Sequence, residues 1–208
     1  MEGFENHTGK LFIMSGPSGA GKGTICQRLI AETDVQLSVS ATTRAPRPGE
    51  IEGVSYFFMD KDAFLENVEK GKFLEHATVY GNYYGTPKDK VEEKLSQGID
   101  VVLEIDIQGA MKVKENYPDG VFIFILPPSM AELRKRITGR GSETEEVINY
   151  RLSQTLNEIS YMEKYDYCVV NGDLDEAVKR VKAIVIAEHS KVKNDVSQLI
   201  ERYKREEM

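Results

Sequence analysis

The chain has 208 residues, of which 40% are hydrophobic and 29% charged, the balance of a folded protein with one sizeable core. Its formal net charge of −7 excludes the basic surface that non-specific nucleic-acid binding requires, so we expect no nucleic-acid partner. No run approaches the ~18–20 apolar residues of a membrane span, and Met1–Gly9 lacks the apolar segment of a signal peptide, so we expect a cytoplasmic protein without a membrane partner.

Short apolar runs that alternate with helical patterns define the predicted core. Leu11–Ser15 has the pattern of a buried strand before a glycine loop, and Lys22–Glu32 has the apolar spacing of a helix. Further strand-like runs are Val101–Ile105, Val121–Leu126 and Tyr167–Val170. Further helical patterns are Val91–Gln97, Gln108–Asn116, Met130–Thr138 and the stretch from Leu174 to the end. This alternation predicts an α/β fold with a parallel sheet covered on both faces.

Two stretches interrupt the alternation. The first, from Ser38 to about Ser96, holds β-like pieces at Ser55–Met59 and Phe73–Tyr83 and is predicted to form an inserted lobe. The second is charged and helical around a turn at residues 139–141, which predicts a mobile arm. We therefore predict a single domain over residues 1–208, with these approximate parts: a core at 8–37, 97–128 and 164–208, a lobe at 38–96 and a lid at 129–163.

The segment from Gly16 to Thr24 follows the first predicted strand and opens the first predicted helix, which is the setting of a phosphate-binding P-loop. Its glycines let backbone N–H groups turn toward phosphates, and the helix N-terminus adds positive partial charge. Lys22 adds a full positive charge. The P-loop pattern has Ser or Thr directly after the lysine, but here Gly23 follows Lys22 and Thr24 comes next. The hydroxyl that would approach Mg²⁺ is therefore shifted by one residue along the chain. This GKGT ending resembles nucleoside-monophosphate kinases.

Two acids, Glu104 and Asp106, end the apolar run that begins at Val101. In P-loop proteins an acid on a neighbouring strand helps to hold Mg²⁺, often through water. Residues two apart on a strand share a face, so we expect both side chains to point the same way. Asp106 is alternatively an N-cap of the following helix, and the two roles are compatible.

Two arginines, Arg44 and Arg47, lie three residues apart in a loop bounded by prolines. Fixed guanidinium groups suit a phosphate dianion, and the alternative is a pair of ordinary surface charges. Tyr56 and Tyr84 could add hydroxyl donors. Because side chains alternate along a strand, only one of Tyr83 and Tyr84 is expected to face such a site.

Several segments between about residues 10 and 190 resemble guanylate kinases, in the same order along the chain. They are Ser38–Glu50, Tyr56–Phe58, Phe73–Glu75, Gly81–Thr86, Glu104–Gly109 and Gly139–Gly141. The resemblance implies a P-loop α/β core in three layers, with an inserted GMP-binding lobe and a helical lid. It implies an enzyme of purine nucleotide metabolism that transfers the γ-phosphate of ATP to GMP, or to dGMP, with Mg²⁺. Whether the chain is a monomer or a homodimer stays open.

By this resemblance the site residues fall into two groups. The ATP-binding group comprises Gly16, Pro17, Ser18, Gly19, Ala20, Gly21, Lys22, Gly23, Thr24, Arg136, Arg140 and Asn171. The GMP-binding group comprises Ser40, Arg44, Arg47, Tyr56, Glu75, Tyr84, Thr86, Glu104 and Asp106. The resemblance assigns catalysis to Lys22, Arg44, Arg140 and Arg151. Thr24 and Asp106 are expected to approach Mg²⁺ through water.

Glu75 is expected to read the base, with help from Ser40, Thr86 and Glu104. Guanine presents N1–H and N2–H₂ donors side by side, which one carboxylate can accept together. Adenine has an acceptor at N1, which would face the carboxylate unpaired, and an unpaired polar group in a closed site is costly. Where the family often has Asp, this chain has Glu104, whose reach is longer by a methylene.

The resemblance implies direct in-line transfer. Arg136, Arg140 and Arg151 would approach the ATP phosphates as the lid closes, and preorganised cations stabilise the charge of the transition state. Closure also excludes water as a competing acceptor. Because the phosphate oxygen of GMP is already anionic, neither a nucleophilic residue nor a phospho-enzyme is expected.

Three other functions compete with this one. A non-catalytic guanylate-kinase-like binding module would have a degraded phosphate loop, whereas Lys22 and its glycines are intact here. A kinase for AMP or a pyrimidine nucleotide would not need Glu75 within the Ser40–Tyr84 segment. A GTPase-like switch would leave Arg44 and Arg47 without a role and would need a guanine-reading motif that the sequence lacks at the expected place.

Overall fold

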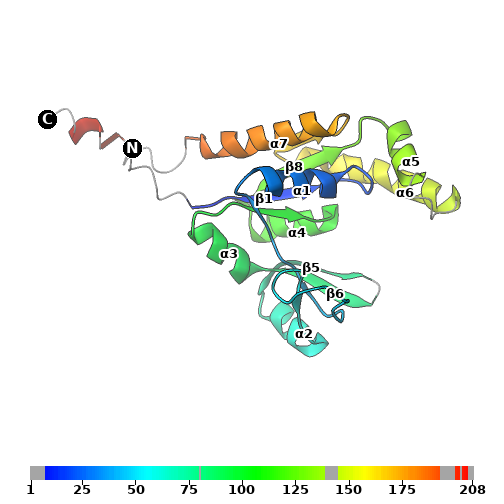
Figure 1. Cartoon of the computed structure of the whole chain (residues 1–208), viewed down its shortest axis with the longest axis horizontal. Coiled ribbons are helices and arrows are strands. Elements are labelled where there is room, and N and C mark those ends of the chain that lie inside the picture. Colours follow the sequence, from blue (N-terminus) through cyan, green and yellow to red (C-terminus); the bar gives the residue numbers. More distant parts are fainter. Residues whose placement is uncertain (1–7, 80, 139–144, 193–199, 202, 206–208) are drawn as a thin grey trace.

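The structure is a computed structural model that describes residues 8–79, 81–138, 145–192, 200–201 and 203–205, with the side chains of residues 147 and 151 excepted. It contains a five-stranded sheet and a four-stranded sheet, with helices around both (Figure 1). Within these ranges, none of the helices combines the length and the apolar character needed to cross a bilayer.

The five-stranded sheet is parallel and confirms the predicted α/β core. In spatial order its strands are β2 (Gln36–Leu37), β7 (Val101–Glu104), β1 (Leu11–Ser15), β8 (Val121–Leu126) and β9 (Tyr167–Val170). The register pairs Met14 with Glu104 and Ser15 with Phe124. The ends of β1, β7 and β8 therefore meet at one edge of the sheet, which is where open α/β sheets bind ligands.

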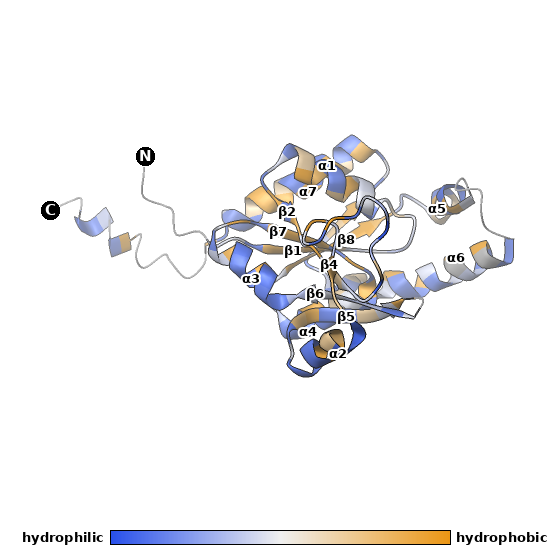
Figure 2. Ribbon diagram, turned by 60° about the horizontal axis from the view of Figure 1, so that its bottom comes forward, coloured by the Kyte–Doolittle hydropathy of each residue, from blue (hydrophilic) through white to orange (hydrophobic). Residues whose placement is uncertain are grey.

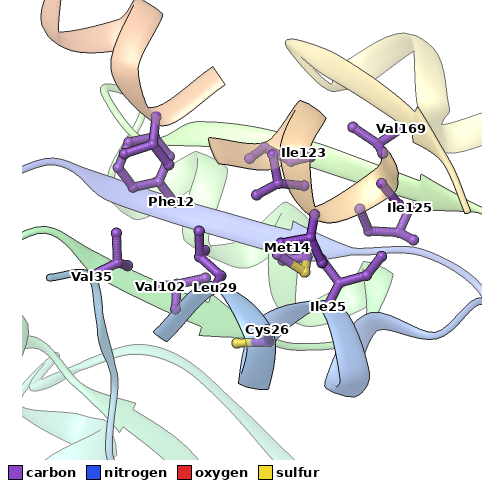
Figure 3. Close-up of a cluster of buried hydrophobic side chains, with 14 of the residues drawn as sticks. Phe12, Met14, Ile25, Cys26, Leu29, Val35, Val102, Ile123, Ile125 and Val169 are labelled. Atoms are coloured by element: carbon purple, nitrogen blue, oxygen red, sulfur yellow. The ribbon is translucent and has the colours of Figure 1, made fainter. Parts of the chain in front are cut away.

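Helices cover both faces of this sheet. The helices on one face are α1 (Lys22–Glu32) and α7 (Leu174–His189), and those on the other are α3 (Lys88–Ser96) and α4 (Ile107–Asn116). Alternation along β1 sends Met14 toward α1 and Ile13 toward α4. Figure 3 shows Ile25 and Leu29 of α1 beside Met14, in a buried apolar layer. Figure 2 shows the apolar residues concentrated on these strands.

The four-stranded sheet belongs to the inserted lobe, which lies below α4 in Figure 1. In spatial order its strands are β4 (Phe57–Phe58), β3 (Ala41–Thr42), β6 (Asn82–Pro87) and β5 (Phe73–Val79). Two predictions need correction here, because the β-like run from Phe73 to Tyr83 is split between two antiparallel strands, and the run Ser55–Met59 keeps only two strand residues.

A helix of the lobe, α2 (Lys61–Glu69), was not predicted. The side chain of Asp60 caps it by accepting a hydrogen bond from the Ala63 N–H at 2.8 Å. Its buried Phe64 stacks on Phe73 with ring centroids 4.5 Å apart, which fixes the helix against the sheet. The core of the lobe therefore forms between α2 and β5.

The predicted arm consists of α5 (Met130–Thr138), α6 (Glu145–Ile159) and the 3₁₀ turn η1 (Ser160–Lys164). Figure 1 shows α5 and α6 extending sideways from the core. Their own small cluster, Leu133 and Ile137 with Ile148, holds the two helices together. In the C-terminal region, α7 ends at His189, and residues 200–201 and 203–205 are helical again, whereas the sequence pattern predicts one helix from Leu174 to the end.

Candidate functional site

The phosphate loop connects β1 to α1 at the edge where the core strands end. Gly16, Gly19 and Gly21 have φ of 144°, 88° and 91°, which only glycine adopts readily. A Cβ at Gly16 would lie 2.2 Å from the Ile125 carbonyl oxygen, so the loop also needs glycine for space. No side chain caps the N-terminus of α1, so its first N–H groups remain directed at the loop, as an anion site requires.

Lys22 folds back onto this loop. Its Nζ donates hydrogen bonds to the carbonyl oxygens of Gly16 at 2.6 Å and Pro17 at 3.1 Å. Burial lowers the pKa of the amine, and the carboxylates of Glu104, Glu158 and Asp106 oppose that shift. A phosphate would offer the ammonium a stronger, charged acceptor than these two carbonyl groups.

Asn171 and Arg136 support the loop from the core and the arm. Asn171, just after β9, is buried and donates from Nδ2 to the Ala20 carbonyl at 2.8 Å. Arg136 of α5 donates from Nη2 to the Asn171 carbonyl at 3.0 Å and from Nε to Glu132 at 3.2 Å. Two residues predicted to bind ATP are therefore linked to each other and to the loop.

Replacing Gly21 by alanine is expected to destabilise the fold by about 2–4 kcal/mol, because the new Cβ would lie 2.3 Å from Asn171 Nδ2 at a left-handed φ. Gly49→Ala is the matched control. Gly49 has nearly the same φ of 89°, but no described atom lies within 4 Å of the added Cβ, so only backbone strain of about 1–2 kcal/mol is expected. Thermal unfolding measures both, and equal losses would contradict a role for the Asn171 contact.

The acids Glu104 and Asp106, at and just after the end of β7, point in different directions, contrary to the prediction that they share a face. Strand β7 ends at Glu104, and the chain then turns so that Asp106 caps α4, accepting from the Gly109 N–H at 2.7 Å. The N-cap alternative for Asp106 is therefore confirmed. The Glu104 carboxylate lies instead against Gly23 of α1. The prediction was wrong because it assumed that the strand continues to Asp106.

The predicted phosphate group of the lobe surrounds Arg44. Its Nη2 donates to Glu50 Oε1 at 2.7 Å and its Nη1 to the Ala45 carbonyl at 2.8 Å. The hydrogen bond with Glu50 raises the pKa of Arg44 and lowers that of Glu50. The guanidinium lies 5.4 Å from the centroid of the Tyr56 ring, and that ring lies 6.0 Å from Tyr84. Three predicted residues therefore come together.

Glu50 was missed by the sequence analysis, although it organises this loop. Besides pairing with Arg44, it accepts a hydrogen bond from the Arg47 N–H at 2.7 Å. The Arg47 side chain itself is exposed. The position of the Glu50 carboxylate depends on the turn at Gly49, whose positive φ directs the chain back toward Arg44 and Arg47. The sequence offered no direct signal for the pairing of Glu50 with Arg44.

Glu75 and Thr86 form the second half of the lobe's site. Glu75 on β5 is 8% exposed, and its Oε1 accepts a hydrogen bond from the Thr86 hydroxyl at 2.7 Å. Burial raises the pKa of Glu75; Thr86 opposes this shift, and the nearby Asp106 adds to it. A Cβ at Gly109 would lie 3.4 Å from oxygens of both acids, so the first turn of α4 leaves this space open.

The remaining predicted residues occupy varied positions. Ser40 is half-buried, and its carbonyl accepts from the Phe57 N–H at 2.9 Å. Thr24 is exposed on the first turn of α1. Arg140 and the side chain of Arg151 lie outside the described residues.

Glu158 on α6 was not predicted, because one acid in a charged helix carries no signal. Burial raises the pKa of Glu158, and the positive charge of Lys22 opposes that shift.

Strand alternation separates the two neighbouring tyrosines. Tyr83 packs into the lobe core, with its ring 5.5 Å from Phe64, while Tyr84 lies beside Tyr56. Only Tyr84 is thus placed with the arginine group.

The chain is similar to known proteins over most of its length. The family model "Guanylate kinase" matches residues 8–188. A guanylate kinase of Clostridium acetobutylicum is 57% identical over 184 residues, which is 88% of each chain. One of Halalkalibacterium halodurans is 54% identical over 200 residues, 96% of each chain. The crystal structure of guanylate kinase from Anaplasma phagocytophilum superposes with a TM-score of 0.71 at 37% identity, covering 94% of this chain and 95% of that one.

Proposed function

The chain belongs to the guanylate kinase family, and we propose that it transfers the γ-phosphate of ATP to GMP in a direct in-line step, giving ADP and GDP. The observation that carries the proposal is that one chain holds both halves of such a site. In the core, the Lys22 amine lies within the phosphate loop and donates a hydrogen bond to the Gly16 carbonyl. In the lobe, the buried Glu75 carboxylate accepts a hydrogen bond from the Thr86 hydroxyl.

Each half has a chemical task. The loop N–H groups and Lys22 would bind the ATP phosphates, and Arg44, Arg47, Tyr56 and Tyr84 would bind the phosphate of GMP. Glu75 would read the base with help from Ser40, Thr86 and Glu104, and Asp106 is a further proposed GMP-binding residue. Arg136 would join the phosphates from α5, with Arg140 and Arg151 of the lid. The proposed division into core, GMP-binding lobe and lid lets the two substrates close on each other.

The residues present fit a magnesium ion carried by ATP. Thr24 and the acids Glu104 and Asp106 supply oxygen atoms, which Mg²⁺ prefers as ligands. Thr24 and Asp106 remain proposed metal-side residues, acting through water. When bound, the ion would offset charge on the β- and γ-phosphates. The cytoplasmic location, the absence of nucleic-acid and membrane partners, the use of dGMP and the choice between monomer and homodimer also stay predictions.

Release of ADP by the purified protein tests the proposal. MgATP is supplied with GMP, AMP, CMP, UMP or no acceptor, and we expect rapid release with GMP alone. Release with another nucleotide would overturn the assignment of Glu75 to the base. If a folded protein releases no ADP with any acceptor, the alternative of a non-catalytic binding module is favoured.

A further inference from the structure

Strand β5, which carries Glu75, lies at the edge of the lobe sheet and is irregular beside that residue. The register of β5 against β6 shifts between Phe73 and His76. Leu74 and Glu75 together therefore lie opposite Thr86. Such a bulge interrupts the ladder of hydrogen bonds and changes the direction of a side chain. The pairing with β6 thus does not by itself fix the backbone at Glu75.

Helix α4 lies along the outer edge of β5 and bonds to the main chain on both sides of Glu75. Asn116 donates from Nδ2 to the Leu74 carbonyl at 2.9 Å. Lys112 donates from Nζ to the His76 carbonyl at 2.7 Å. Lys112 and Asn116 are four residues apart, so they lie on the same side of the helix. A helix that covers an edge strand protects it, but here both bonds go to the two carbonyl groups that flank one functional side chain.

The same helix is fixed to the core. Ala110 and Val113 of α4 are buried in the apolar cluster that contains Ile13 of β1. The side chain of Leu74 packs into this cluster too. Figure 1 shows α4 between β1 and β5. The residue that precedes Glu75 is therefore held to the core twice, by its side chain and by its carbonyl group.

Lys112 also acts on Glu75 through its charge. The Glu75 carboxylate faces Thr86 of β6, and on the α4 side the charged groups are Asp106 and Lys112. Burial raises the pKa of Glu75 and Asp106 adds to the rise, whereas Thr86 and Lys112 oppose it. Lys112 therefore favours the ionised carboxylate, which is the form that accepts two donors. Asn116 is neutral and acts by its hydrogen bond alone.

We propose that Lys112 and Asn116 are positioning residues for base recognition, which hold Glu75 so that both of its carboxylate oxygens meet the N1–H and N2–H₂ donors of guanine. The inference rests on the proposed function, because it assigns Glu75 to the base. It deepens that assignment by placing part of the acceptor specificity on two exposed residues of a core helix.

The test compares kcat/KM for GMP with kcat/KM for IMP, whose base keeps the N1–H donor and lacks the N2 amine. The wild type should prefer GMP, because IMP leaves one Glu75 oxygen without a donor. A displaced carboxylate keeps the bond to N1 more readily than both bonds, so the GMP-to-IMP ratio should fall about fivefold in Asn116→Leu and in Lys112→Met. KM for ATP should not change. An unchanged ratio in either variant would remove that residue from the proposal, and an unchanged ratio in both would overturn it.

Lys114→Met is the matched control. Lys114 lies on the same helix and also donates to a main-chain carbonyl, but that carbonyl belongs to Lys164 of η1. The GMP-to-IMP ratio of this variant should equal that of the wild type. An equal fall in Lys114→Met would show that any loosening of α4 disturbs base recognition, and it would contradict a specific role for the two proposed residues. Thermal unfolding of each variant identifies any loss that comes from the fold.

The dependence of GMP affinity on pH separates the effect of charge from the effect of position. Without the charge of Lys112 the pKa of Glu75 should rise further, so the affinity of Lys112→Met should decline at a higher pH than that of the wild type. Lys112→Arg keeps the charge and should restore the wild-type profile. Asn116→Leu should lower the GMP-to-IMP ratio without moving the profile, and an equal shift in that variant would contradict the division of roles.

Wild-type kinetics separate this inference from the function beneath it. If the wild type phosphorylates GMP in preference to IMP and both variants keep that preference, only the inference fails. If the folded wild type phosphorylates neither nucleotide, the proposed function fails and the inference with it.

Discussion

Replacing Lys22 by methionine is expected to lower kcat for GMP phosphorylation by about 10²–10³-fold while the fold persists. Methionine keeps an apolar stem of similar length but removes the charge that Nζ carries beside the Gly16 and Pro17 carbonyl groups. That ammonium is the only cation within the phosphate loop itself, residues 16–24, so no neighbour in the loop replaces it as negative charge builds on the transferring phosphate.

Stability should change little in the same variant. Two carbonyl groups lose a charged donor, which costs about 1–3 kcal/mol each, but a partly buried charge, which is itself costly, is also removed. These effects oppose each other, so the midpoint of thermal unfolding should stay within a few degrees. Lys90→Met, at an exposed ion pair on α3, is the matched control and should retain wild-type kcat. A wild-type rate in Lys22→Met would remove this lysine from the mechanism.

The core could be predicted because its signals are local. The four residues Leu11–Met14 are all apolar because the strand is buried on both faces. The glycines that follow at positions 16, 19 and 21 are required by positive φ and close approach. Helix α2 was missed, although Asp60 followed by Phe64 and Val68 is the pattern of a capped amphipathic helix. No element was predicted between the β-like pieces at Ser55–Met59 and Phe73–Tyr83, where α2 lies.

The finer geometry of the site could not be predicted, because it depends on contacts between distant residues and on the exact backbone path of short turns. Asn171 contacts the loop across 151 residues of sequence. Whether Glu104 and Asp106 share a face depends on whether β7 continues past Glu104, and the sequence left open both a continuing strand and an N-cap at Asp106. The pairing of Glu50 with Arg44 likewise requires the turn at Gly49.

Glu75→Gln is expected to lower kcat/KM for GMP by about 10²–10³-fold. The glutamine keeps the shape of Glu75 and one acceptor, but its NH₂ group would face one of the two guanine donors. A donor left unpaired in a closed site costs a few kcal/mol. Activity with AMP should stay low, because the N1 acceptor of adenine still has no matched geometry. Parallel kinetics with GMP and AMP measure both effects.

The pH dependence of GMP binding gives a second, independent readout. Glu75 must be ionised to accept both guanine donors, and burial raises its pKa, so wild-type affinity should fall as the pH drops through that raised value. The phosphate of GMP itself titrates near pH 6, and Glu75→Gln retains that effect but lacks the carboxyl. The ratio of the two affinities therefore isolates Glu75, and it should shrink toward acid pH.

Stability should move in the opposite direction from activity. Because the folded pKa of Glu75 is raised, the wild type loses stability as the pH rises from the ordinary value of 4.5 through the folded value, and the neutral glutamine avoids this loss. Glu75→Gln should thus unfold at an equal or higher temperature at neutral pH. Glu66→Gln, on the surface of the same lobe, is the matched control and should change neither quantity. Wild-type kcat/KM in Glu75→Gln, with a pH profile that still parallels the wild type, would show that another group reads the base.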